Sequence, residues 1–345
     1  MNLLEGSKSQ VRMGPKIPHK ETKAERRAVR KQVGKLETQL VGTNTRERYA
    51  DSFSAFCRFA KMNLKELLED LPKIDDLLAA YIEFMWEDGE PKSYANYAVA
   101  SVQFYIPAAK RRLPLSWKLV STWNKLELPS RVTPLTPAMA MSMAGLFYEW
   151  KWMACGHMII VAFSCFLRTG EMFLIRRRDV VLPVRQGQAA VIFLQDTKGG
   201  QRKQMQWEKV TVYETVALQC LTALCQDKRP GELLLDLSVY RFRSIWKEAV
   251  AVLKLNHLKV QPYSIRRGGA TSAYRQGMSF EELMSRGRWQ HLATARIYLD
   301  EGLQELSAIQ LPAATRAALH RSYLVFTRRK PGGDAWKGGR STKGS

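Results

Sequence analysis

The stretch RGRWQHLATARIYLD at residues 286–300 holds two side chains whose types could serve chemistry. Trp289 offers an indole N–H, and Tyr298, nine residues later, offers a phenolic oxygen that can form a covalent intermediate. In an amphipathic helix the same pair is more often found in the core or at its rim. Whether the two serve packing or chemistry therefore depends on the rest of the chain.

Two further motifs place single charges where they could act on a substrate. In FLRTGEM, residues 166–172, Arg168 ends an apolar helix, so we expect its guanidinium to be partly buried and to need an acidic partner such as Glu171. In DTKGG, residues 196–200, Lys198 lies on a turn between two expected strands. Each has a plainer interpretation, namely an ion pair that only joins two helices and a lysine that is only solvated.

The motif QPYSIRRGGA at residues 261–270 points to an anion. Pro262 is typical of a helix start, and Tyr263 and Arg266 lie three residues apart, so both can point to one side while Arg267 faces elsewhere. Backbone N–H groups at a helix start favour anions. The motif therefore favours an anionic ligand.

The charge balance of the whole chain favours a polyanionic partner. Its 345 residues include 54 Lys and Arg against 32 Asp and Glu, a formal net charge of +22. Nucleic acid and an acidic membrane both fit such a charge, but the longest apolar run, residues 158–167, is too short to span a bilayer. The first ten residues lack the order of a secretory signal, so we expect an intracellular protein without membrane contact.

Cysteines and histidines indicate neither a disulfide framework nor a metal site. The cysteines form an odd set without C-x-x-C spacing, which is typical of buried thiols in a reducing compartment, and no His/Cys cluster has ligand spacing. We therefore expect no metal and no small-molecule cofactor. The cysteines are Cys57, Cys155, Cys165, Cys220 and Cys225.

Composition and periodicity divide the chain into four parts. Residues 1–35 are rich in Lys and Arg with few large apolar groups, which predicts a flexible basic arm. Residues 36–131 show repeated helical periodicity, and the proline-rich stretch at 129–137 interrupts it and suits a linker. A second domain is expected at 132–325, followed by a disordered basic tail at 326–345.

The second domain changes from helical to strand periodicity and back. Three short runs, DVVLPV, AAVIFL and QMQWEKVTVY, are separated by Gly-containing turns and predict a three-stranded antiparallel sheet. The expected fold is mainly α, with a helical first domain and an α+β second domain. Helices are expected at about 44–60, 64–70, 74–87, 92–110, 116–125, 137–150, 156–167, 214–226, 239–255, 263–276, 279–286 and 292–298.

In chain order, the marked residues resemble the signature of the tyrosine site-specific recombinases, the integrase family that includes Cre and lambda integrase. That signature runs arginine, hairpin lysine, His-x-x-Arg, then His or Trp, then a tyrosine. The resemblance covers about residues 40–300, and the RRGGAT run resembles recombinases of eukaryotic mobile elements. The matching positions are Arg168, Lys198, Arg266, Trp289 and Tyr298.

This resemblance implies a helical core-binding (SAM-like) N-terminal domain, a catalytic second domain and a specific chemistry. Tyr298 would attack the scissile phosphodiester and form a 3′-phosphotyrosine. Arg168 and Arg266 would hold the nonbridging oxygens, since a planar guanidinium with fixed donors matches their geometry. Trp289 would offer its N–H, and Lys198 would protonate the departing 5′-oxygen.

Tyr263 departs from the family pattern, because it stands where the family most often has histidine. A phenol, with an ordinary pKa of about 10, is a poorer proton acceptor at neutral pH than an imidazole at about 6.5. We expect Tyr263 to position a phosphate oxygen by a hydrogen bond, and His291 is an alternative source of an imidazole. The expected site comprises Arg168, Lys198, Tyr263, Arg266, Trp289 and Tyr298, with Glu171 in support.

The resemblance also implies partners. These are double-stranded DNA held between the two domains, and a homotetramer on DNA, because the last helix of the family often docks into a neighbouring subunit. It implies site-specific recombination or integration by an intracellular, DNA-associated protein of a nucleus or a nucleoid. Two alternatives stay open: a type IB topoisomerase-like enzyme that reseals the same strand, and a catalytically silent DNA-binding protein derived from a recombinase.

Overall fold

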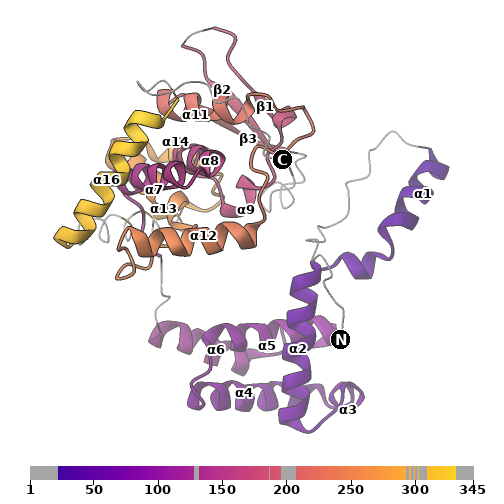
Figure 1. Ribbon diagram of the computed structural model, residues 1–345. Coiled ribbons are helices and arrows are strands. Elements are labelled where there is room, and N and C mark those ends of the chain that lie inside the picture. Colours follow the sequence, from indigo (N-terminus) through magenta and orange to yellow (C-terminus); the bar gives the residue numbers. More distant parts are fainter. Residues whose placement is uncertain are drawn as a thin grey trace, which may run out of the picture. The chain divides into compact units, whose positions relative to one another are not determined.

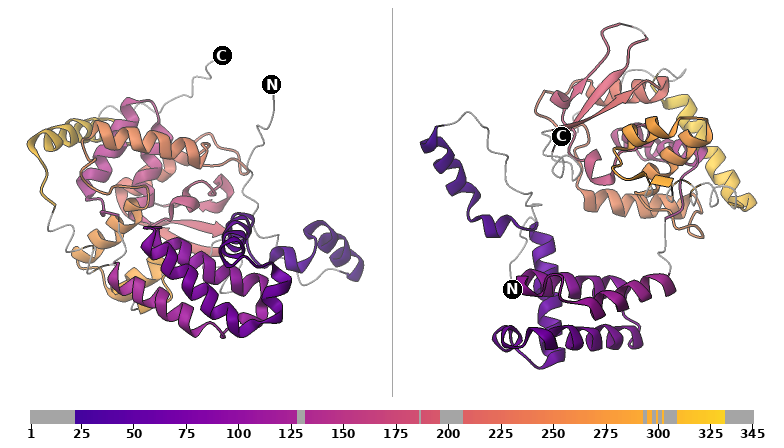
Figure 2. Two further views of the ribbon diagram at one scale, coloured as in Figure 1. Left: turned by 90° about the horizontal axis from the view of Figure 1, so that it is seen from below. Right: turned by 180° about the vertical axis from the view of Figure 1, so that it is seen from behind.

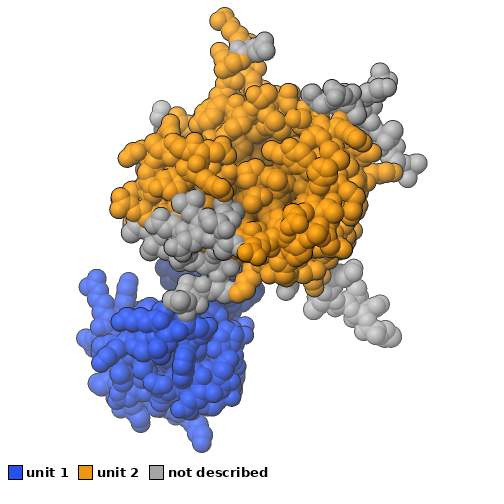
Figure 3. Space-filling view, turned by 90° about the vertical axis from the view of Figure 1, so that its left-hand side faces the viewer, with its two compact units in different colours: residues 1–130 blue, residues 131–345 orange. Residues whose placement is uncertain are grey.

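The chain forms two compact units, Met1–Ser130 and Arg131–Ser345 (Figure 1; Figure 3). The structure is a computed structural model that describes residues 22–127, 132–185, 187–195, 207–292 and 309–331, and the single positions 295, 296, 299 and 302. Each unit is described by itself below. Within these described residues, no helix combines the length and the apolar character that crossing a bilayer requires.

The first unit has one apolar core, which is formed by its helices from residue 43 onward. Phe56, Ile82, Val99 and Val102 are buried and come from three different helices. The side chain of Asp75 joins two helices, because its carboxylate accepts the N–H groups of Leu115 at 2.8 Å and Ser116 at 2.9 Å. The helices are α1 (Lys23–Val33), α2 (Thr43–Ala60), α3 (Leu64–Glu69), α4 (Leu71–Glu87), α5 (Lys92–Tyr105) and α6 (Pro114–Leu126), with short 3-10 helices at Leu36–Gln39 and Pro107–Ala109.

Helix α1 lies inside the segment predicted to be a flexible basic arm, residues 1–35. Thr22 and Glu25 form a capping box: the Thr22 hydroxyl accepts the N–H of Glu25 at 3.3 Å, and the Glu25 carboxylate accepts the N–H of Thr22 at 2.6 Å. Such reciprocal bonds satisfy backbone groups at a helix start. The prediction is therefore corrected for residues 23–33, whereas residues 1–21 lie outside the described part of the chain.

The second unit consists of helices packed around a small sheet. Its first helix begins where expected, with Pro137 at the first position and the Thr136 hydroxyl accepting the N–H of Met139 at 3.1 Å. The helices are α7 (Pro137–Glu149), α8 (Met153–Ser164), α9 (Thr169–Met172), α11 (Thr215–Cys225), α12 (Val239–Val252), α13 (Ser264–Arg275), α14 (Phe280–Gly287) and α16 (Ala313–Arg329), with a 3-10 turn at Arg177–Asp179.

The sheet is antiparallel, in the order β1 (Val180–Val181), β2 (Ala190–Gln195) and β3 (Trp207–Val212). Gln195 pairs with Trp207, so the segment that joins β2 to β3 includes Lys198. The predicted mainly α fold with a three-stranded antiparallel sheet is confirmed. Strand β1 is shorter than the predicted run because Pro183 has no N–H to donate to a strand ladder.

Two adjacent glycines let α13 approach the segments around it. A Cβ added at Gly268 would lie 2.1 Å from the carbonyl oxygen of Leu135, and one at Gly269 would lie 2.0 Å from that of Phe163. Any larger residue would therefore push α13 away from α8 and from the chain before α7. This close packing fixes the position of Arg266, which is separated from the two glycines only by the buried Arg267.

Helix α16, the yellow helix of Figure 1 and Figure 2, packs along α7 of its own chain. The Ser142 hydroxyl donates to the carbonyl oxygen of Leu319 at 2.8 Å, and a Cβ at Gly145 would overlap the carbonyl of Ser322. The helix continues to Arg329, and Phe326 is 1% exposed. The predicted tail at 326–345 is therefore corrected for residues 326–329, because Phe326 contributes to the core; residues 332–345 lie outside the described part.

Candidate active site

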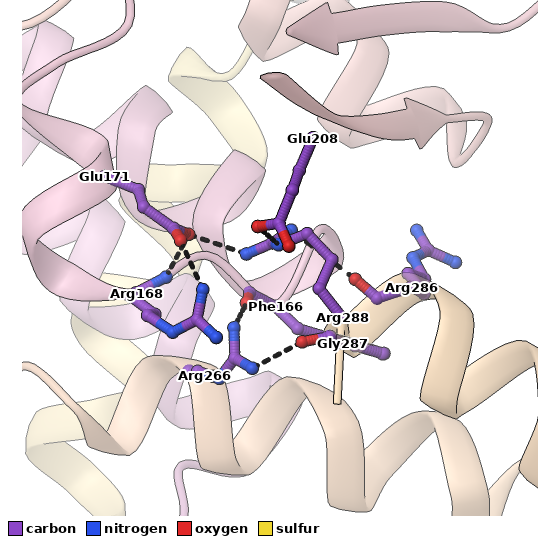
Figure 4. Close-up of polar contacts among 8 residues, drawn as sticks. All are labelled: Phe166, Arg168, Glu171, Glu208, Arg266, Arg286, Gly287 and Arg288. Atoms are coloured by element: carbon purple, nitrogen blue, oxygen red, sulfur yellow. Dashed lines mark hydrogen bonds and ion pairs between the residues drawn. The ribbon is translucent and has the colours of Figure 1, made fainter. Parts of the chain in front are cut away.

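Arg168 is the residue just before α9, its N-cap, and directly follows the turn after α8. Its Nη1 donates to Oε1 of Glu171 at 2.7 Å, and its backbone N–H donates to Oε2 of the same carboxylate at 2.7 Å (Figure 4). The Glu171 side chain is 7% exposed, whereas the Arg168 side chain is 31% exposed. Glu171 thus holds the guanidinium in one orientation while leaving part of it open to a ligand.

Arg266 comes from α13 and lies against the turn that carries Arg168. It is 1% exposed, and its Nη1 and Nη2 donate to the carbonyl oxygens of Phe166 and Gly287 (Figure 4). Phe166 adopts the left-handed region, with φ of 50°, which is costly for a residue with a side chain. A charged donor on its carbonyl oxygen stabilises that turn, and it brings two arginines 98 positions apart in sequence to one place.

The Trp289 ring lies beside Arg266. The guanidinium carbon of Arg266 is 5.2 Å from the ring centroid, within the range of a cation–π interaction. A Cβ at Gly287 would lie 2.4 Å from atoms of the ring, so the indole occupies the space that the glycine leaves. The ring also packs on the small cluster formed by Phe166, Ala270, Leu283 and Leu299.

Arg288 is a buried arginine of this site that the sequence did not single out. Its Nη2 lies 2.6 Å from Oε2 of Glu171, and its Nε lies 3.5 Å from Oε2 of Glu208 on β3. The side chains of Arg288, Glu171 and Glu208 are all 7% exposed or less. Burial lowers the pKa of Arg288, and the two carboxylates oppose that shift. The only signal in the sequence was the position of Arg288 beside Trp289, and nothing in the sequence pairs it with Glu171.

A second buried arginine, Arg286, lies two residues before Arg288, but its side-chain hydrogen bonds go to other elements and not to Glu171. Its Nη2 pairs with Glu214 and donates to the Ser164 hydroxyl at 3.3 Å. Its guanidinium lies between two rings, 5.2 Å from the centroid of Phe166 and 4.9 Å from that of Tyr213. Arg286 therefore joins α14 to the end of α8 and the start of α11.

Tyr263 lies at the start of α13 and is 42% exposed. It lines a cleft of about 370 Å³ together with Thr169, the residue after Arg168. Arg243 and Lys247 of α12 line the same cleft and make one wall of it basic. The hydroxyphenyl group therefore stands at the edge of the site, where a ligand in the cleft would meet it. His291, the alternative source of an imidazole, is exposed.

Two expected site residues lie outside the described part of the chain. They are Lys198, between β2 and β3, and Tyr298. The described residues bring together Arg168, Glu171, Arg266 and Trp289. Among the described residues, no three His, Cys, Asp or Glu side chains gather as metal ligands.

Comparison with known proteins identifies the fold. The Tn1549 transposon integrase in complex with transposon right end DNA is similar, with a TM-score of 0.58 and 14% identity over 84% of this chain and 96% of that chain. The chain has the tyrosine recombinase fold. The XerH site-specific recombinase bound to palindromic difH substrate, in a post-cleavage complex, gives a TM-score of 0.55 and 16% identity over 77% of this chain and 79% of that chain.

A third structure shares this recombinase fold. A lambda integrase dimer bound to a COC′ core site gives a TM-score of 0.55 and 14% identity over 80% of this chain and 95% of that chain. No family model and no curated protein matches the sequence. At such identities the likeness shows the recombinase fold alone, and the chemistry must be argued from the side chains of this chain.

Proposed function

We propose that this protein breaks and rejoins DNA strands through a 3′-phosphotyrosine intermediate on Tyr298, in site-specific recombination or integration. The observation that carries the proposal is the convergence of Arg168 and Arg266 on one turn, beside Trp289. Two guanidinium groups that are held by buried partners are suited to the charge that develops on a phosphodiester during attack. The recombinase fold and the net charge of +22 support DNA as the substrate.

The proposed reaction exchanges one phosphate ester for another. The phenolic oxygen of Tyr298 loses its proton to the surrounding water and attacks phosphorus, the bond from phosphorus to the 5′-oxygen breaks, and Lys198 protonates that oxygen. An incoming 5′-hydroxyl then attacks the phosphotyrosine, and the phenolic oxygen leaves. The number of phosphate ester bonds is unchanged at each step, so the reaction needs no external energy source.

The remaining side chains have separate roles in this proposal. Arg168, which is partly exposed, contacts a nonbridging oxygen directly. Arg266, which is buried, adds a second positive charge from the protein interior. Trp289 packs against Arg266 and offers its indole N–H, while Tyr263 donates a hydrogen bond to phosphate from the edge of the cleft. Glu171 supports Arg168 and does not contact substrate.

Double-stranded DNA is the proposed partner, and the protein is proposed to act as a DNA-associated homotetramer. The two units take the roles of a core DNA-binding domain and a catalytic domain, expected over residues 36–131 and 132–325. The lysines and arginines of both units supply contacts to phosphates. Because α16 packs on its own α7 here, a tetramer would need contacts other than an exchange of that helix, or would have to release it.

The first test is the substitution Tyr298→Phe, with Tyr323→Phe on α16 as the matched control. Each variant is incubated with duplexes that carry a nick inside a randomised central segment, because loss of the short strand beyond the nick traps a covalent adduct. We expect adducts that survive denaturation with the wild type and with Tyr323→Phe, and none with Tyr298→Phe. The affinity for the duplexes should be equal in the wild type and in both variants.

An adduct that persists in Tyr298→Phe would remove Tyr298 from its role. The products also separate the alternatives: strands joined to a new partner indicate recombination, whereas relaxation of supercoiled DNA without exchange indicates a topoisomerase-like enzyme.

A catalytically silent DNA-binding protein is the second candidate. It is favoured by the burial of Arg266, whose two terminal nitrogens both donate to main-chain carbonyls. Binding without any adduct would support it.

A further inference from the structure

The backbone of Arg288 adopts a conformation that is unfavourable for an arginine. Its φ of 56° and ψ of 37° lie in the left-handed region, where glycine has no steric penalty and other residues do. The Arg288 side chain is only 4% exposed, so its long stem and its charge are both buried. Contacts of the side chain must therefore offset the strain of the backbone and the loss of hydration.

Those contacts lead to Arg168 through a single carboxylate. Oε2 of Glu171 accepts Nη2 of Arg288 at 2.6 Å and the backbone N–H of Arg168 at 2.7 Å, while Oε1 accepts Nη1 of Arg168. Glu171 therefore receives three charged or backbone donors and has no freedom to rotate (Figure 4). Removing the Arg288 side chain would take one hydrogen bond away from Oε2 of Glu171, one of the two carboxylate oxygens that bind Arg168.

The same contacts affect the net charge around Arg168. Glu171 and Glu208 are two buried carboxylates, and Arg288 lies between them. Without its positive charge, the negative charge of both carboxylates would act on Arg168 and would weaken its attraction for an anionic ligand. Glu208 belongs to β3, which is joined to β2 by the segment that includes Lys198. Arg288 thus connects that hairpin to the carboxylate that holds Arg168.

We propose that Arg288 is a positioning residue for Arg168. Acting through Glu171, it fixes the orientation of the Arg168 guanidinium and preserves its positive charge for a DNA phosphate. Through Glu208 it ties strand β3 of the β2–β3 hairpin to the same carboxylate. This inference rests on the proposed function, because it assumes that Arg168 binds phosphate.

The test substitution is Arg288→Gln, which keeps hydrogen-bonding groups and removes the charge. Its matched control is Arg286→Gln, two residues away. The Arg286 side chain is 5% exposed and is also paired with a carboxylate, but its hydrogen bonds go to Glu214 and Ser164 and not to Glu171. Both substitutions remove the charge of a buried arginine, although Glu214 is 45% exposed and Glu171 only 7%. Thermal melting of both proteins measures the structural loss that each substitution causes.

In adduct formation on the nicked duplexes, we expect Arg288→Gln to lower the single-turnover rate at saturating DNA about tenfold or more, with DNA affinity unchanged. Arg286→Gln should keep the rate within about twofold despite a similar loss of thermal stability. Arg288→Lys should recover part of the rate, because it restores the charge without the planar fork. In a Glu171→Gln background, Arg288→Gln should have less than about a twofold effect, because the mediator is gone.

A second readout does not depend on DNA cleavage. Phenylglyoxal modifies accessible arginines, and mass spectrometry measures its reaction with Arg168 at increasing inorganic phosphate. We expect phosphate to protect Arg168 in the wild type and in Arg286→Gln, and about a tenfold higher phosphate concentration to be required in Arg288→Gln. If the wild type forms no adduct, the proposed function fails, and this protection still decides the role of Arg288. Equal protection and equal cleavage rates in the two Gln variants would overturn the inference.

Discussion

Arg168 and Arg266 carry the same charge but are held in different ways. Arg168 is held by one carboxylate and is partly exposed, whereas Arg266 is buried and bound to two main-chain carbonyl oxygens. An arginine of the first kind keeps part of its guanidinium open to a ligand while its carboxylate partner holds it. An arginine of the second kind also supports the fold, because its loss would leave buried carbonyl oxygens without a donor.

Lysine substitution should separate these two roles. We expect Arg168→Lys to lower the rate of adduct formation about 100-fold with little change in stability, because lysine cannot donate in the planar geometry. Arg266→Lys should lower the rate and also reduce the free energy of unfolding by about 2 kcal/mol, since the single nitrogen of lysine cannot reproduce the two separate donor positions of the guanidinium. Single-turnover kinetics and urea unfolding of the two variants measure this. Equal stability losses would contradict the difference in roles.

At the scale of elements, the site depends on how closely α13 packs. Gly268 and Gly269 let its backbone approach Leu135 and Phe163, and Arg266 enters the site from the same helix. A displacement of α13 would therefore move Arg266 away from the Phe166 carbonyl. Stability and site geometry are coupled through this one helix.

The substitution Gly268→Ala tests that coupling. The added Cβ would lie 2.1 Å from a main-chain oxygen, which cannot move aside as a flexible side chain could, so we expect a loss of at least about 2 kcal/mol in unfolding free energy. Gly231→Ala in the same unit is the control, because its Cβ would have no atom within 4 Å. Urea denaturation measures both. A Gly268→Ala protein as stable as the control would show that α13 can shift freely.

Most elements could be predicted from local signals, and the exceptions have local causes. Apolar periodicity predicted α2 and α12 because each buries one face in a core. The start of α7 was predicted from Thr136 as a cap and Pro137 as a first-turn proline. The predicted helix at 92–110 ends earlier, at Tyr105, because Pro107 cannot continue it. The many basic and few large apolar residues predicted a flexible arm at residues 1–35, but the capping box at Thr22 starts a helix at Lys23–Val33.

On the scale of the whole molecule, the net charge of +22 predicts that affinity for the proposed DNA partner depends strongly on salt. Each phosphate neutralised by a lysine or arginine releases counterions, so affinity falls steeply as salt rises. We expect binding of a non-cleavable duplex to weaken by a factor of at least about 1,000 between 50 and 200 mM salt. Fluorescence anisotropy titrations at several salt concentrations measure the slope. An affinity that hardly changes would contradict phosphate contacts as its main source.

The sequence by itself determined the helical periodicity, the three strand runs, the basic charge and, through the order of its motifs, the candidate site residues. These features depend on neighbours within a few positions or on composition, which the chain carries in any conformation. Only the tertiary structure decided that Arg266 binds the turn before Arg168 and that Arg288 shares Glu171 with Arg168. Arg288 and Glu171 are 117 positions apart, and such a buried ion pair exists only once α9, α14 and β3 have packed around it.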